Sequence, residues 1–234
     1  MQLLIIILAI SLIVFLFCLH VLAKEDLIFV RKNITMEILF NIAFYTIGIG
    51  LLCSRIVYVI EHFSIGFLNP LVFFLFPYFP GLSLAGGVGG ALLFTLLYRA
   101  KKYPNGRIFD FFSMAFLAAL PVGFLGQGLL LGMRDRFSGI FMPIIFLITL
   151  IFFVKILLPL NTRGEIEDGS LGFLFVVVFS LTTLISLIVR ANNFIGLVMQ
   201  LDVILLVILL IFSIIMLLVK EKHISLKKPN RGDN

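Results

Sequence analysis

The stretch Ile38–Ile60, ILFNIAFYTIGIGLLCSRIVYVI, decides the class of this protein. It is apolar over a length that crosses a bilayer as a helix, which takes roughly 20 residues. It nevertheless contains Arg55, and a charge at such a depth is costly unless it has a partner or a function. Tyr58 and His62 follow at positions i+3 and i+7, so the three side chains share one face of the predicted helix.

The composition extends this prediction to the whole chain. Of the 234 residues, 62% are hydrophobic and only 13% are charged. A soluble protein of this size could not bury so much apolar surface, and backbone groups in lipid must bond within their own helix. The sequence therefore predicts an all-α, polytopic membrane bundle of about seven transmembrane helices. We place them at residues 2–23, 38–60, 83–99, 108–131, 138–158, 170–190 and 198–219.

Lysine and arginine residues alternate between the gaps that separate these helices. The first, third and fifth gaps and the C-terminal tail are rich in them, whereas the second, fourth and sixth gaps are poor. Because basic loops stay on the cytoplasmic side, we predict that the N-terminus lies outside and the C-terminus is cytoplasmic. Residues 1–219 then form a single transmembrane domain, and residues 220–234 form a polar cytoplasmic tail. The acidic loop Leu160–Ser170 reads as a solvated cytoplasmic turn, and Leu71–Phe79 as a re-entrant or interfacial segment.

Several classes of protein are disfavoured by the same pattern. The basic residues lie in short loops without interleaved aromatic residues, which argues against nucleic-acid binding. Cys18 and Cys53 both lie within predicted helices, where they are typical packing residues. Together with three scattered histidines they predict no metal centre, and nothing in the sequence predicts a cofactor.

Two glycine-rich stretches, PGLSLAGGVGG (80–90) and PVGFLGQGLLLG (121–132), have two interpretations. Close helix packing is the simpler one, and Gly86 and Gly90 have the small-xxx-small spacing for it. The other is that glycines such as Gly86 and Gly87 leave room for a lipid phosphate at the N-terminus of a helix. Gln127 is the polar side chain of the second stretch, and we expect it to point inward and bond a neighbouring helix.

The two arginines within or at the end of apolar runs also have alternative interpretations. Arg190 ends its helix, where its side chain can extend to the lipid headgroups or join a site with Arg55. Arg55 lies deeper, and its candidate partners are a lipid phosphate or Asp202. We expect Arg55, Tyr58, Gln127 and Arg190 to line one cavity in the outer half of the bundle.

An ordered set of motifs resembles the prolipoprotein diacylglyceryl transferase family. In LLCSRIVYVIEH (51–62), Arg55 and Tyr58 match the family pattern Gly-Ala-Arg-x-x-Tyr. The segment GSLGFLFVVVFSLTTLISLIVR (169–190) is similar to the family's penultimate helix. The other matching features are the glycines of 81–90, the basic turn at 99–102, Asp110 and the glycine-punctuated helix end at 121–132.

The resemblance implies an enzyme of lipoprotein biosynthesis in the inner, or plasma, membrane of a bacterium. Such an enzyme transfers the diacylglyceryl group of phosphatidylglycerol to the thiol of a lipobox cysteine in a prolipoprotein. Its implied partners are that anionic phospholipid and the prolipoprotein signal peptide. The residues that the resemblance implies for lipid binding are Arg55, Tyr58, Gly86, Gly87, Gln127 and Arg190.

The chain departs from the family pattern at four places, one of which is the family's Asn-Gly-Glu, replaced here by Leu129–Leu131. The family's His-Gly-Gly is Ala85-Gly86-Gly87 here, which removes the histidine base. The family's arginine and asparagine in Gly-Arg-x-Gly-Asn are replaced by Phe124 and Gln127. His62 is then the one histidine on the predicted outer side that could act as the base. The sequence therefore leaves three functions open: a divergent transferase, a non-catalytic lipid- or lipoprotein-binding homologue, and a small transporter subunit.

Overall fold

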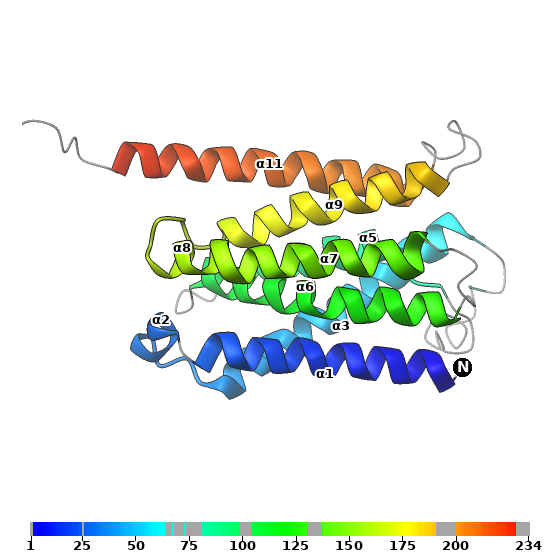
Figure 1. Ribbon diagram of the computed structural model, residues 1–234, viewed down its shortest axis with the longest axis horizontal. Coiled ribbons are helices and arrows are strands. Elements are labelled where there is room, and N and C mark those ends of the chain that lie inside the picture. Colours follow the sequence, from blue (N-terminus) through cyan, green and yellow to red (C-terminus); the bar gives the residue numbers. More distant parts are fainter. Residues whose placement is uncertain are drawn as a thin grey trace, which may run out of the picture.

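The computed structural model describes residues 2–24, 26–63, 67, 73, 81–98, 104–130, 137–190 and 200–227. Seven helices run side by side in these residues, so the predicted all-α bundle is confirmed (Figure 1). They are α1 (Gln2–Lys24), α3 (Met36–Glu61), α5 (Leu84–Leu97), α6 (Asn105–Leu130), α7 (Met142–Phe152), α9 (Ser170–Arg190) and α11 (Leu201–Lys227).

Short helical elements adjoin this set. Helix α2 (Leu27–Arg31) follows α1, and α7 is flanked by two π-helical turns, η2 (Phe137–Phe141) and η3 (Phe153–Leu157). Helix α8 (Leu158–Thr162) continues directly from η3, so residues 137–162 form one continuous helical segment.

Six of the helical segments in the described residues are long and apolar enough to cross a membrane. Helix α5 is the exception, because its 14 residues rise only about 21 Å. The predicted third helix, 83–99, is therefore present but too short to span a bilayer of about 30 Å alone. Helix α11 extends past the predicted end at 219 to Lys227, and the predicted re-entrant segment Leu71–Phe79 lies, apart from Phe73, outside the described residues.

The two ends of the bundle are distinguished by the elements that lie there. One end holds the end of α1, the beginning of α6 and the turn after α8, with Lys24, Arg107 and Arg163, and we call it the basic end (Figure 1). The opposite end holds the end of α3 and the beginnings of α5 and α11, and we call it the Ser83 end. The N-terminus lies at the Ser83 end and α11 finishes at the basic end (Figure 1), as an odd number of antiparallel helices requires. The predicted orientation, with the Ser83 end outside, stays a prediction.

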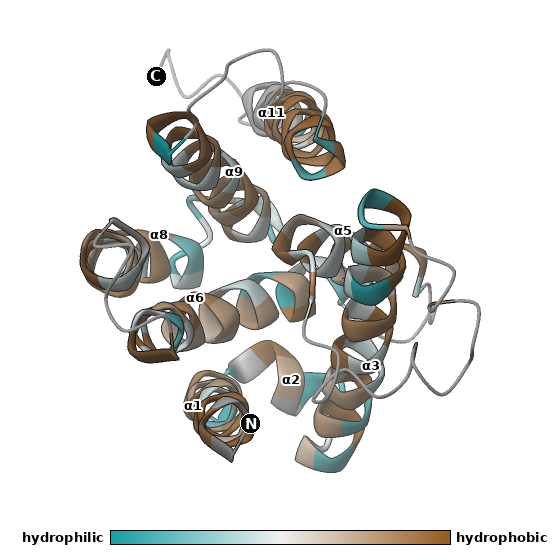
Figure 2. Ribbon diagram, turned by 90° about the vertical axis from the view of Figure 1, so that its right-hand side faces the viewer, coloured by the Kyte–Doolittle hydropathy of each residue, from teal (hydrophilic) through white to brown (hydrophobic). Residues whose placement is uncertain are grey.

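Helix α6 is the centre of the bundle, and helices α1, α5, α7 and α9 pack around it (Figure 2). It is buried along most of its length, through Phe109, Met114, Leu117 and Phe124 among others. The large side chains exposed on the outer helices are apolar, for example Ile13, Phe17 and Ile148 in α1 and α7. This is the surface expected of a protein whose solvent is lipid.

Glycines bring α3 and α5 close together. A Cβ atom on Gly86 would lie 2.7 Å from Cγ2 of Val57, and one on Gly90 would overlap the side chain of Cys53. Gly50 and Gly87 face each other across the same interface. The packing interpretation of PGLSLAGGVGG is therefore confirmed, because side chains at these positions would push the two helices apart.

Candidate functional site

An apolar pocket of about 290 Å³ lies among α1, α3, α5, α6 and α9. It extends along α5 from Leu84 to Thr95, which corresponds to about 16 Å of helix. Its wall includes Leu8, Phe15, Ile47, Gly87, Val88, Leu92, Phe112, Phe116 and Val176. The long axis of the pocket therefore follows the helices, which is the direction of an acyl chain in a bilayer.

Two threonine hydroxyls in the pocket wall donate to the backbone of their own helices. Thr46 Oγ1 donates to Ile42 O at 2.8 Å, and Thr95 Oγ1 donates to Ala91 O at 2.7 Å. Each of these bonds lies within one helix and turns the hydroxyl hydrogen away from the pocket. The wall thus offers apolar atoms along most of its length, which favours a hydrocarbon over a polar ligand.

The polar end of the pocket is built around Ser83. Its hydroxyl accepts from Gly86 N at 2.9 Å, which caps the N-terminus of α5, and donates to Oδ1 of Asp202 in α11. Its backbone joins α3 twice: Ser83 N donates to Ser54 O at 3.1 Å, and Ser54 Oγ donates to Ser83 O at 2.7 Å. Both serines line the pocket, so one end of an apolar cavity meets a hydroxyl–carboxylate pair.

Arg55 lies next to Ser54 and is 3% exposed. Its Nε donates to Phe73 O at 3.0 Å, and its Nη1 donates to Gly81 O at 2.8 Å. The guanidinium carbon also lies 5.6 Å and 5.3 Å from the ring centroids of Tyr58 and Phe67. Arg55 therefore holds the chain that leads into α5 against the end of α3.

Tyr58 and His62 continue the same face of α3, as their spacing predicted. The two rings stack with centroids 4.5 Å apart, and His62 is exposed beyond Tyr58. Gly81 lies against the Tyr58 ring with φ +153°, and a Cβ atom there would overlap the ring carbons. Only glycine fits both the backbone conformation and the space at position 81.

The structure brings some of the predicted residues together and separates others. Arg55 and Tyr58 are in contact beside the Ser83 end, and Gly87 lines the pocket while Gly86 packs on Val57. Gln127 is exposed, so the expectation that it points into the bundle is wrong: its position on α6 faces outward, whereas Gly126 and Gly128 face the core.

Arg190 is likewise exposed, at the end of α9. It bonds within its own helix, through Nε to Ser186 O at 3.3 Å and Nη2 to Ser186 Oγ at 3.1 Å. The apolar pocket is lined by neither Arg190 nor Gln127, and also not by Arg55 or Tyr58. The shared cavity expected for these four side chains is thus not this pocket.

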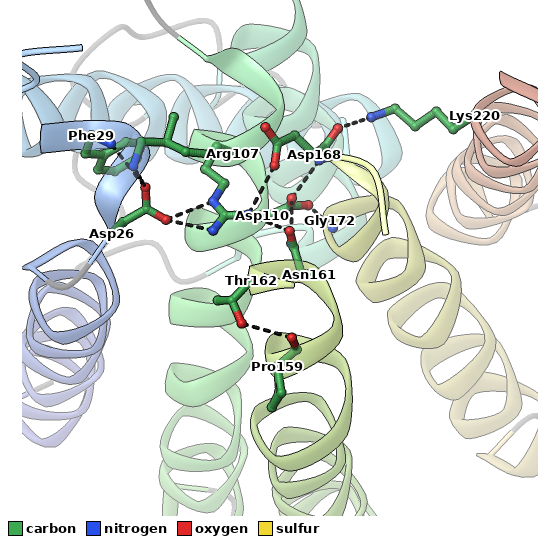
Figure 3. A network of polar contacts seen from close by, with 12 residues as sticks. Asp26, Phe29, Arg107, Asp110, Pro159, Asn161, Thr162, Asp168, Gly172 and Lys220 are labelled. Carbon is green, nitrogen blue, oxygen red and sulfur yellow. Dashed lines mark hydrogen bonds and ion pairs between the residues drawn. The ribbon is translucent and has the colours of Figure 1, made fainter. Parts of the chain in front are cut away.

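A second polar cluster, at the basic end, was missed by the sequence analysis. Arg107 at the start of α6 is 5% exposed and pairs with Asp26 at 2.8 Å and with Asp168 at 3.1 Å (Figure 3). It also donates to Oδ1 of Asn161. Asp26 in turn caps α2, by accepting from Ile28 N at 2.9 Å. Arg107 was counted with the basic residues of the third gap, which predict topology, but the structure places it in the interior as an ion-paired residue.

Asp110 completes this cluster one helical turn along α6. It is fully buried and accepts from Gly169 N at 2.6 Å, Gly172 N at 2.8 Å and Asn161 Nδ2 at 3.2 Å (Figure 3). The carboxylate thereby caps the N-terminus of α9, where the helix dipole favours negative charge. The loop Leu160–Ser170 is therefore only partly a solvated turn, because both of its ends are fastened to α6.

A signal for this cluster was present in the sequence. Arg107 and Asp110 are three residues apart at the beginning of an apolar run, so they share a helix face. A pocket of about 480 Å³ opens beside the cluster, lined by Asp26, Ile28, Arg31, Arg107, Asn161, Thr162, Gly164, Ile166 and Asp168. The buried carboxylates of the cluster are bonded to groups inside the protein. We therefore interpret the cluster as a structural contact that holds the helices together.

Two of the positions at which the chain departs from the family pattern, Ala85 and Phe124, lie in the apolar core. Ala85 and Phe124 are both buried in the same cluster of side chains, which includes Phe146 and Phe179. The Phe124 ring stacks on Phe146 with centroids 5.4 Å apart. Apolar side chains of the core therefore stand at the two positions where the family pattern has a histidine and an arginine.

Comparison with known proteins agrees with the motif analysis. Residues 4–129 match the family model described as prolipoprotein diacylglyceryl transferase. The match covers more than half of the chain, so the protein belongs to this family. No curated protein matches the chain.

Proposed function

We propose that this member of the prolipoprotein diacylglyceryl transferase family binds phosphatidylglycerol and transfers its diacylglyceryl group to the thiol of a lipobox cysteine. The observation that carries the proposal is the apolar pocket, which follows the helix axes and ends at Ser54 and Ser83. An acyl chain occupies the pocket, and the glycerol backbone and headgroup then lie at the Ser83 end. In the predicted orientation this end faces outward, where a secreted prolipoprotein presents its cysteine.

The reaction needs a leaving phosphate to be stabilised by positive charge. Arg55 supports this role because it follows Ser54 in α3 and its buried guanidinium donates to Gly81 O, two residues before Ser83. Tyr58 packs against the guanidinium and holds it in place. Gly86 and Gly87 let α3 and α5 approach and shape the pocket wall, while Gln127 and Arg190 are proposed contacts for headgroups at the bundle surface.

A second candidate function is lipid or lipoprotein binding without transfer. The observation that favours it is the apolar packing around Ala85 and Phe124. These side chains have neither the proton acceptor nor the cation that the family pattern has there. The two candidates share the pocket and differ only in the chemical step.

The proposal is tested with the full chain in vesicles that contain phosphatidylglycerol. A lipobox peptide is added, and mass spectrometry measures the gain of a diacylglyceryl group on its cysteine. Native mass spectrometry of the purified protein measures the retained phospholipid. We expect both signals. Retained lipid without peptide modification selects the binding function, and the absence of both overturns the proposal.

Two matched variants of α5 test the pocket itself. Ala91→Phe fills the pocket, and we expect it to lose lipid retention and transfer together. Leu93→Phe places the same ring on the exposed face of the same helix and should retain both. Chromatography in detergent confirms that each variant is folded. Equal lipid retention in the two variants would show that the acyl chain lies elsewhere.

A further inference from the structure

We infer that Ser83 and Asp202 form the proton relay that deprotonates the acceptor thiol. The inference rests on the proposed transferase function and identifies the group that replaces the family's missing histidine. Ser83 is the catalytic residue, because its side chain lines the pocket at the end where the reacting carbon must lie. Asp202 acts through Ser83: its carboxylate orients the Ser83 hydroxyl and receives the proton of that hydroxyl.

The geometry orients the serine hydroxyl for this role. Ser83 is 2% exposed, and its Oγ is held between Gly86 N, which donates to it, and Asp202, which accepts from it. The hydroxyl hydrogen therefore points toward the carboxylate of Asp202. The remaining lone pair of the oxygen is available to a donor that enters from the pocket. This is the arrangement of an activated hydroxyl with its neighbouring base.

The proton and electron movements balance within these groups. The Ser83 oxygen takes the proton of the cysteine thiol while its own hydrogen passes to Asp202. The sulfur attacks the glycerol carbon that carries the phosphate, so a C–S bond forms as the C–O bond breaks. The bonding electrons leave with the phosphate oxygen, and glycerol phosphate departs. Asp202 finally returns its proton to the water outside.

The other candidate bases fit this position less well. Ala85 lies two residues beyond Ser83 in the apolar core and cannot bind a proton. His62 is exposed and stacked on Tyr58, and it does not line the pocket. Glu61 lies within electrostatic range of Asp202 and is also no part of the pocket wall. Among the described residues, Ser83 alone joins the pocket directly to a carboxylate.

Three substitutions separate the relay from the structural role of the same residues. Asp202→Asn keeps a hydrogen-bond acceptor for Ser83 but removes the base. Ser83→Asn keeps a good helix cap but removes the hydroxyl, and Ser83→Thr keeps both. We expect Asp202→Asn and Ser83→Asn to lower the transfer rate about 100-fold or more, as loss of a general base does. Lipid retention by Asp202→Asn should stay within about twofold, because Asp202 is not part of the pocket wall. Ser83→Thr should recover most of the rate that Ser83→Asn loses.

The pH dependence provides a second measure of the same relay. The rate of the unmodified protein should rise with pH, because general-base catalysis removes a proton from the thiol, and Asp202→Asn should lose this rise. Glu61 at the end of α3 interacts electrostatically with Asp202, and His62 and Arg55 lie on the same helix end, so Glu61→Gln and His62→Ala are measured in parallel. A loss of the rise in one of those variants, with Asp202→Asn unchanged, assigns the base elsewhere and overturns the relay.

The remaining outcomes separate this inference from the proposed function. Transfer by the unmodified protein and by Asp202→Asn at equal rates overturns the relay and leaves the transferase function standing. Lipid retention without transfer in the unmodified protein overturns both the transfer function and the relay. The assignment of the apolar pocket as a lipid-binding site then still stands. Loss of lipid retention in Asp202→Asn shows that the pair is structural and also overturns the relay.

Discussion

The two buried arginines, Arg55 and Arg107, lie at opposite ends of the bundle and differ in the groups that bind them. Arg107 is held by the carboxylates of Asp26 and Asp168. Arg55 donates to the main-chain carbonyls of Phe73 and Gly81 and is flanked by aromatic rings. Arg107 joins carboxylates from two separate connections between helices, and Arg55 holds the main chain beside the pocket.

This difference indicates a division of roles between the two ends. At the basic end, the carboxylates of Asp26 and Asp110 are engaged by interior donors, so the end is built for stability. At the Ser83 end, a hydroxyl–carboxylate pair borders the apolar pocket, so the end is built to meet a ligand. We therefore expect substitutions at the basic end to reduce stability, and those at the Ser83 end to reduce lipid-dependent activity.

The largest loss of stability is expected for Arg107→Ala. It leaves the buried carboxylate of Asp26 without its cation, and breaking a buried ion pair costs about 3–5 kcal/mol. The free energy of unfolding is measured by denaturant titration in mixed micelles. Arg163→Ala, an exposed arginine at the same end, is the control and should change stability by less than about 0.5 kcal/mol. Equal losses in the two variants would contradict the interior role of Arg107.

Asp110→Ala should cost about 3 kcal/mol. It leaves the buried N–H groups of Gly169 and Gly172 without an acceptor, and each such group costs about 1–3 kcal/mol. The same titration measures the loss. Asp110→Asn retains one acceptor oxygen and should lose less. A stability unchanged by Asp110→Ala would show that Asp110 does not fasten α9 to α6.

Glycine substitutions on α5 test the packing of α3 against it. Gly86→Ala forces a Cβ atom against Val57 and should cost about 1–3 kcal/mol through overpacking. Gly48→Ala is the matched control, because nothing lies within 4 Å of a Cβ atom at that position. It should be neutral or stabilising by up to about 1 kcal/mol, since alanine favours the helix. If both variants behave alike, the α3–α5 interface is looser than described.

The smallest change in stability is expected for Arg55→Lys. Lysine retains the charge but cannot reproduce the guanidinium fork that reaches Phe73 O and Gly81 O, so we expect a loss of about 1 kcal/mol. Retention of phosphatidylglycerol should fall almost as far as in Arg55→Ala. Native mass spectrometry of the three proteins checks this. Unchanged lipid retention in the lysine variant would show that charge alone matters at position 55.

Much of the candidate site was predictable because it depends on local pattern. The spacing of Arg55, Tyr58 and His62 placed them on one helix face, and the structure stacks Tyr58 between the other two. The orientation predicted for the Gln127 side chain was wrong, because that prediction used only its polarity. Polarity predicted an inward side chain, but its neighbours Gly126 and Gly128 occupy the core-facing positions of that turn.

The sequence by itself determined that the protein lies in a lipid bilayer, where its helices run, and that α3 and α5 approach closely. Apolar runs of membrane-spanning length and a glycine spacing are properties of single segments, and they follow from hydrogen bonding in lipid and from side-chain volume. Only the tertiary structure decided which distant polar groups meet. Arg107 joins Asp26 across 81 positions and Ser83 joins Asp202 across 119, and the pocket needs walls from five helices. Such contacts depend on how helices rotate and pack against one another, which the pattern of any one segment does not contain.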